Sequence, residues 1–119
     1  MRREEFDRFA DEYEALHARN VRASGEEPAF FAEYKVLDLR RLALETGALE
    51  RTSRGVILDY GGGVGNSAGF LVREFPGSLV LNVDVSLRSL RLAQGRRQGA
   101  LQVAFDGATL PLASGSVDA

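Results

Sequence analysis

The chain of 119 residues predicts an α/β fold built around a parallel β-sheet. After residue 55, short apolar runs alternate with helical patterns, and the connections between them are short. Each apolar run also leads to an aspartate. Strands that alternate with helices in this way form parallel sheets through right-handed crossovers. We therefore expect a β-α-β-α-β unit over residues 55–119 and an N-terminal helical cap over residues 1–54, the two forming one structural body.

Two helical patterns make up the cap. Apolar residues recur at helical spacing over residues 6–16, between charged residues on the other side of the helix. Pro28 suits the first turn of a second helix and Gly47 its C-terminal cap, with a broad apolar surface between Phe30 and Leu44. We expect the phenylalanines of both helices to be core residues rather than an aromatic cofactor box: Phe6, Phe9, Phe30 and Phe31.

The elements of the second unit follow in order from residue 56. "VILD" is typical of a buried strand, and the glycine-rich loop after it leads into the helical pattern "NSAGFLVREF". Pro76-Gly77 marks a turn. The remaining segments predict a second strand in "SLVLNVD", a second helix in "SLRSLRLAQ" and a third strand in "ALQVAFD".

Composition and charge exclude several classes of protein. A net charge of -2 gives no reason to expect nucleic acid or an anionic membrane as a partner. The chain has no cysteine, which excludes disulfides and thiolate metal sites, and we predict no metal centre. No stretch is apolar and long enough to cross a bilayer, and the charged start is unlike a secretory signal. We expect a cytoplasmic protein.

The predicted strands finish with Asp59, Asp84 and Asp106. In open parallel sheets, ligands bind outside the carboxyl ends of the strands. One such acid could be a helix N-cap or a turn residue, but three beside a glycine loop favour a shared ligand. Asp84 stands 19 positions after Gly65, which is about the spacing at which an acid reaches the hydroxyls of a bound ribose.

The glycines alone do not identify the nucleotide. The stretch from Gly63 to Ala68 satisfies G-x-G-x-x-A, so a nicotinamide or flavin dinucleotide-binding domain remains an alternative. Asp59 argues against it, because an anion just before the loop repels a pyrophosphate and attracts an ammonium or sulfonium group. A non-catalytic nucleotide-binding or interaction module is the third possibility.

The motifs resemble those of the class I S-adenosylmethionine-dependent methyltransferases. "ILDYGGGVG" is similar to their first motif, D-x-G-x-G-x-G, which this chain fills with Asp59, Gly61, Gly63 and Gly65. The position after Gly61 is often cysteine or serine in that family; here it is Gly62, a departure that we expect to affect the stiffness of the loop.

Two further segments resemble the same family. "LNVDVSLRSLRLA" is similar to the second-strand motif, with Asp84 as the ribose-binding acid and Val85 beside it. "FDGATLPLASGSVDA" resembles the region in which an acid approaches the adenine amine, here Asp106 with Gly107. The N-terminal helices resemble those that cover the cofactor in small-molecule methyltransferases, which makes Tyr13 and Lys35 expected cofactor contacts.

The resemblance implies S-adenosylmethionine as cofactor, S-adenosylhomocysteine as product, and methyl transfer to a small-molecule acceptor. It assigns no catalytic base. It also implies the N-terminal half of a Rossmann-like fold with strand order 3-2-1, out of seven strands in the order 3-2-1-4-5-7-6. The chain stops at Ala119, where the fourth strand should begin, so we expect a truncated protein that is incomplete as a catalyst. Its first strand should keep an open apolar edge that pairs with a second copy or with the missing half.

Overall fold

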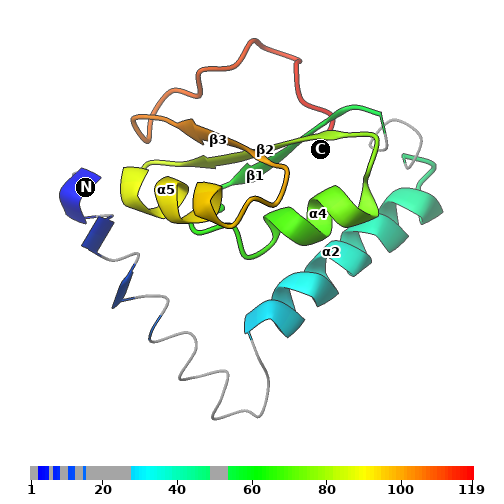
Figure 1. Cartoon of the computed structure of the whole chain (residues 1–119). Coiled ribbons are helices and arrows are strands. Elements are labelled where there is room, and N and C mark those ends of the chain that lie inside the picture. The colour runs from blue at the N-terminus through cyan, green and yellow to red at the C-terminus, as the bar shows by residue number, and fades with distance from the viewer. Residues whose placement is uncertain (1–2, 6, 9–10, 13–14, 16–27, 49–53) are drawn as a thin grey trace.

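The computed structural model describes residues 3–5, 7–8, 11–12, 15, 28–48 and 54–119. Within them the protein is α/β, with one open sheet of three parallel strands in the order β1-β2-β3 (Figure 1). This confirms the predicted fold class. In chain order the elements are α2 (Pro28–Glu45), β1 (Val56–Tyr60), α4 (Ala68–Glu74), β2 (Leu79–Asp84), α5 (Leu87–Gly95) and β3 (Leu101–Ala104).

The two faces of the sheet bury different partners. Helices α4 and α5 lie on one face, and the segment after β3 crosses the other (Figure 1). On the helical face, one core cluster joins the sheet to α2 and α4: Val36, Ile57, Leu71, Phe75 and Val80. On the opposite face, Leu110 and Leu112 pack against a second cluster: Leu81, Val83, Val85 and Phe105. Strand residues of alternating parity therefore supply the two cores, as the pleat requires.

Helix α2 begins at Pro28 and ends beside Gly47, as the sequence predicts. Gly47 has a φ of +76°, and the N–H of Ala48 donates to the carbonyl of Ala43 at 2.8 Å. A left-handed glycine with this backward hydrogen bond satisfies the last carbonyls of a helix. The end of α2 is thus fixed by its own sequence.

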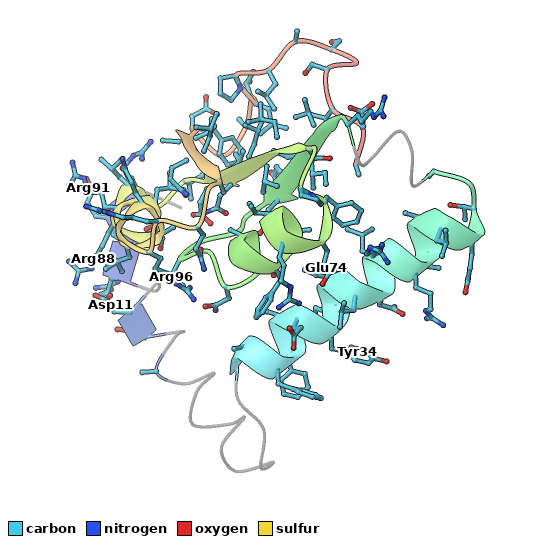
Figure 2. All side chains as sticks on the ribbon, turned by 45° about the vertical axis from the view of Figure 1, so that its right-hand side comes forward. Asp11, Tyr34, Glu74, Arg88, Arg91 and Arg96 are labelled. Carbon is cyan, nitrogen blue, oxygen red and sulfur yellow. The ribbon has the colours of Figure 1, made fainter. Side chains whose placement is uncertain are left out.

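The face that α2 buries differs from the one expected. Small residues form it, with Ala32, Val36 and Ala43 buried, whereas Phe30 is 53% and Tyr34 62% exposed. Figure 2 shows Tyr34 pointing away from the rest of the molecule. The expectation that Phe30 is a core residue is wrong, because small side chains let α2 approach α4 closely. Phe31 is partly buried, and Phe6 and Phe9 lie outside the described residues.

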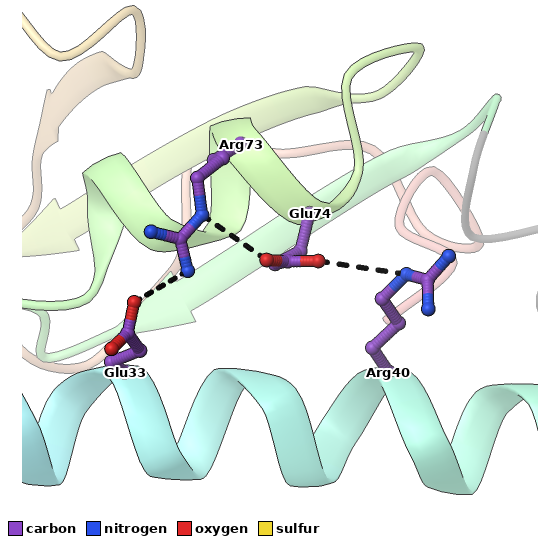
Figure 3. A network of polar contacts seen from close by, with 4 residues as sticks. All are labelled: Glu33, Arg40, Arg73 and Glu74. Atoms are coloured by element: carbon purple, nitrogen blue, oxygen red, sulfur yellow. Dashed lines mark hydrogen bonds and ion pairs between the residues drawn. The ribbon is translucent and has the colours of Figure 1, made fainter.

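Ion pairs also join α2 to α4 (Figure 3). Arg73 lies 2.6 Å from Glu33 of α2 and 3.1 Å from its neighbour Glu74, which in turn lies 3.6 Å from Arg40. Exposed pairs of this kind each contribute only about 0–1 kcal/mol. The packing of Val36 against Leu71 and Phe75 therefore stabilises the contact between the two helices more than the ion pairs do.

The outer edge of β1 is not open, which corrects the expectation for Val56 to Asp59. The carbonyl of Val56 accepts from the N–H groups of Asp118 and Ala119, and the N–H of Leu58 donates to the carbonyl of Ala119 at 2.8 Å. This is the hydrogen-bond pattern of a parallel pair. The edge is covered because the segment after β3 packs its leucines on the sheet and so returns to β1. Self-association through this edge stays a prediction, and the contacts with Asp118 and Ala119 argue against it.

Candidate functional site

The loop after β1 adopts a backbone that its glycines make possible. Gly61, Gly63 and Gly65 have φ values of +70°, +57° and +81°, a region that side chains disfavour. The N–H of Gly61 donates to the carbonyl of Val83 at 2.7 Å, which holds the loop against the end of β2. The three glycines of the predicted motif therefore shape one tight turn at the carboxyl edge of the sheet.

Asp84 ends β2 and fastens this loop to the next helix. Its Oδ2 accepts from the N–H of Gly63 at 3.0 Å, and its Oδ1 accepts from the N–H of Ser86 at 2.8 Å. The side chain is partly buried. Each carboxylate oxygen has a second lone pair, so Asp84 can still accept bonds from vicinal hydroxyls.

Asp59 lies on the adjacent strand, close enough for the two acids to interact. Burial raises the pKa of Asp59, and the negative charge of Asp84 raises it further. No hydrogen bond from a described residue offsets this effect. A partly buried carboxyl group in this position attracts a cation, because a positive charge would remove the repulsion between the two acids.

Asp106 accepts hydrogen bonds within the turn that follows β3. It is exposed and lies two residues after β3, which ends earlier than predicted. The N–H groups of Ala108 and Thr109 both donate to its Oδ1 at 2.8 Å, and these bonds, with that of Thr109 foremost, lower the pKa of Asp106. Beside it, Gly107 has a φ of +89°, and a Cβ there would lie 3.3 Å from Val85. The structure thus brings Asp59, Asp84 and the loop together, while Asp106 follows the turn role that a single acid would have.

The two expected contacts from the N-terminal helices have different outcomes. Tyr13 lies outside the described residues. Lys35 is exposed on α2, and no contact among the described residues links it to the glycine loop. Helix α2 reaches the C-terminal half of α4, whereas the loop precedes that helix. The roles of Tyr13 and Lys35 as cofactor contacts stay predictions.

The described part of the N-terminal segment lies beside α5, next to the end of β2. Asp7 accepts hydrogen bonds from the hydroxyl of Ser86 and, at 3.1 Å, from the N–H of Arg88. The bond from Ser86 lowers the pKa of Asp7. Arg88 also lies 3.0 Å from Asp11 (Figure 2). An open cavity of about 610 Å³ separates this segment from α5, lined by Arg3, Glu4, Asp7, Leu87, Arg88, Arg91 and Leu92.

Two residues that the sequence reasoning missed also support the loop. Asn82 of β2 is fully buried, and its Nδ2 donates to the carbonyl of Gly63 at 3.0 Å. Arg96, after α5, donates to the carbonyl of Val64 at 3.1 Å and to Asn66 at 3.0 Å. Asn82 could have been found from the sequence, because it is the one asparagine inside the apolar run "LVLNVD". No local pattern distinguishes Arg96 from the other arginines near it.

Comparisons with known families and with curated proteins identify no relative of this chain. No model of a protein family matches the chain, and a search of curated proteins gives no match either. The geometry of the loop and its acids is therefore the ground for a functional argument.

Two kinds of feature are absent from the parts of the chain that the structure describes. Within these parts, no helix is both long and apolar enough to cross a membrane. No group of three or more histidine, aspartate or glutamate side chains there could hold a metal ion.

Proposed function

We propose that this chain is the cofactor-binding part of a class I S-adenosylmethionine-dependent methyltransferase that acts on a small-molecule acceptor. The alternation of strands and helices, with β2 in the middle of the sheet, supports the 3-2-1 order of a Rossmann-like half-fold. Asp118 and Ala119 run along the free edge of β1, where that family has its fourth strand. These features agree with the order and spacing of the sequence motifs.

The observation that carries the proposal is the pair of acids behind the glycine loop. Asp59 and Asp84 repel each other, and Asp59 has no hydrogen-bond donor among the described residues. A pyrophosphate would add further negative charge at this point, whereas an adenosyl compound with an ammonium and a sulfonium group would neutralise it. This pair of acids therefore fits S-adenosylmethionine better than a dinucleotide.

Each residue then has a defined task. Asp84 accepts hydrogen bonds from the ribose hydroxyls, and Asp59 attracts the cationic end of the cofactor. Gly61, Gly63 and Gly65 let the backbone approach the ligand closely. Val85 and Gly107 border the adenine end, since a Cβ at Gly107 would meet Val85, and Asp106 offers Oδ2 to the adenine amine. When bound, S-adenosylmethionine supplies an activated methyl group, and the protein's part is to align acceptor and methyl.

Calorimetric titration with S-adenosylmethionine, S-adenosylhomocysteine and NAD tests the proposal. We expect binding of both adenosyl compounds and none, or weaker binding, of NAD. Preferential binding of NAD would overturn the methyltransferase assignment in favour of a dinucleotide-binding domain. A methyl-transfer assay with small-molecule acceptors then separates an enzyme from a module that only binds the nucleotide.

Two variants assign the ends of the ligand. Asp84→Ala should weaken binding of both adenosyl compounds by about 1–3 kcal/mol, the usual loss for hydrogen bonds to a charged group. Asp59→Asn should weaken binding of the sulfonium compound more than that of the uncharged thioether if the sulfonium faces Asp59. Asp38→Ala, on the exposed part of α2, is the matched control and should leave both affinities unchanged.

A further inference from the structure

The buried amide of Asn82 sits beneath the proposed site, and the binding roles above do not use it. It lies in register with Asp59 of β1 on one side and with Gln102 of β3 on the other. Its Nδ2 donates to Gln102 Oε1 at 2.7 Å and to the carbonyl of Gly63 at 3.0 Å. A polar row thus crosses all three strands directly behind the glycine loop.

The orientation of this amide follows from its partners. A backbone carbonyl can only accept hydrogen bonds, so the Asn82 atom that faces the carbonyl of Gly63 must be the nitrogen. The oxygen, Oδ1, then points the other way. It is buried and has no hydrogen-bond partner among the described residues. An unsatisfied buried acceptor of this kind destabilises the folded protein unless a donor reaches it.

The free oxygen and the Asp59 carboxyl both border the place where a side chain at residue 62 would begin. A Cβ built on Gly62 would lie 2.7 Å from Asp59 Oδ2 and would collide with Asn82 Oδ1. The two oxygens therefore converge on the same space beside Gly62. This also explains why residue 62 lacks a side chain, since the amide of Asn82 fills its place. Two acceptors that converge in this way repel each other unless one of them carries a hydrogen.

We infer that Asn82 is a positioning residue for Asp59: in the ligand-free protein the Asp59 carboxyl keeps its proton and donates it to Asn82 Oδ1. Binding of a cationic ligand releases this proton to solvent and leaves the Asp59 carboxylate facing the cation. The first half concerns the protein alone, whereas the release on binding rests on the proposed function.

The charged surroundings agree with this assignment. From β2, Asp84 adds a negative charge that raises the pKa of Asp59, in addition to the effect of burial. Among the described residues, the other groups shown beside Asp59 are neutral, namely Asn82 on β2 and Gly62 of the loop. Among the described residues no cation counteracts Asp84 at this position.

The experiment is a carbon-detected NMR titration of the Asp59 carboxyl in the ligand-free protein. In Asn82→Ala, the titration midpoint of Asp59 should fall toward that of an ordinary aspartate, because the acceptor of its proton is gone. In the control Gln102→Ala, which removes the other partner of the amide, the midpoint should stay where it is in the wild type. An ordinary midpoint in the wild type, or the same midpoint in Asn82→Ala, would overturn the inference.

A further variant keeps the test decisive if Asn82→Ala does not fold. Asn82→Asp retains the shape and the Oδ1 acceptor, and the two carboxyls should share one proton, so the Asp59 midpoint should rise above the wild-type value. An unchanged midpoint in this variant would count against the contact.

Proton release is measured separately, by titrating S-adenosylmethionine in buffers with different ionisation enthalpies. Below the Asp59 midpoint, affinity should rise about tenfold per pH unit, as linkage to one proton requires. Binding without proton release would overturn the second half of the inference. Failure of S-adenosylmethionine to bind would overturn the proposed function and the release together, whereas the NMR titration reports the Asn82 contact in either case.

Discussion

The two βα units of this protein, β1–α4 and β2–α5, have the same plan but treat their polar groups in opposite ways. At the end of β2, both oxygens of Asp84 accept backbone hydrogen bonds, and the hydroxyl of Ser86 caps α5 through the N–H of Ser89 at 3.1 Å. At the end of β1, Asp59 has no donor among the described residues, and Ser67 makes no side-chain cap to α4. The polar side chains of the β2–α5 connection are hydrogen-bonded within it, whereas Asp59 and Ser67 of the β1–α4 unit lack such bonds among the described residues.

This difference separates an acid that stabilises the fold, Asp84, from one whose carboxyl has no hydrogen-bond donor among the described residues, Asp59. Buried polar groups are normally hydrogen-bonded, so each exception calls for an explanation. Asp84 holds the loop and the start of α5 whether or not a ligand is present, whereas Asp59 gains a partner only from its own proton or from a cation. The variants below test the comparison, beginning with the largest expected effect.

Gly62→Ala should destabilise the protein by about 1–3 kcal/mol, the usual penalty for overpacking. The added Cβ meets Asp59 of β1 and Asn82 of β2, two side chains held by the strands behind the loop. Urea unfolding measures the change. Gly95→Ala at the end of α5 is the control: its Cβ meets no atom within 4 Å, and we expect a gain of about 0.5–1 kcal/mol. Equal effects of the two changes would mean that the space beside Gly62 is not filled.

Ser86→Ala should cost about 1 kcal/mol, because it removes the N-cap of α5. Ser67→Ala, at the corresponding position before α4, should change the stability by less than about 0.5 kcal/mol, as expected for a residue without a cap bond. Thermal unfolding of the two variants side by side measures the difference. A similar loss in both would show that the two connections are capped alike.

Asp59→Asn should stabilise the ligand-free protein by about 1 kcal/mol above the Asp59 midpoint, because the amide can donate to Asn82 Oδ1 at a pH at which the ionised carboxylate cannot. The effect should depend on pH. The folded protein keeps the Asp59 proton after the unfolded chain has lost it, so wild-type stability falls as pH rises from the ordinary value of 3.8 through the raised pKa. In the variant this fall should be absent. Unfolding midpoints across that range measure it, and parallel pH profiles would contradict the prediction.

Arg96→Ala should have the smallest effect, about 0.5 kcal/mol, because its bonds to Val64 and Asn66 lie at the surface. The loss should be local, with faster amide exchange in the loop of the β1–α4 connection. Arg91→Ala, within α5, is the control and should leave exchange in the loop unchanged. Equal exchange rates in the wild type and in Arg96→Ala would mean that α5 gives the loop no support.

Much of the fold follows from local sequence. Pro28 and Gly47 bound α2, and the apolar runs around Leu58 and Leu81 specify the buried strands, because these signals depend on backbone preference and periodicity. The covering of the β1 edge could not be predicted from local sequence, because it depends on the path that the residues after β3 take back to β1. The exposed side of α2 did not follow either, because the face that is buried depends on how α2 packs against α4 and the sheet.

The candidate site divides in the same way. The spacing of Asp59, the glycines and Asp84 was enough to bring them together at one edge of the sheet, because parallel strands end at a common edge. The turn role of Asp106 depends on backbone N–H groups that no residue pattern specifies. The convergence of Asn82 and Gly62 required the register between β1 and β2, which places an asparagine opposite an aspartate.

The pairing of β1 with Asp118 and Ala119 has a consequence for how the molecule forms. Val56 and Asp118 are 62 residues apart in sequence, so this contact closes a long loop and comes late on entropic grounds. During synthesis, β1 leaves the ribosome well before the residues that cover its edge. Until they arrive, the strand that bears Asp59 presents unpaired backbone groups to other nascent chains, and the yield of folded protein should depend on how fast residues 105–119 are made.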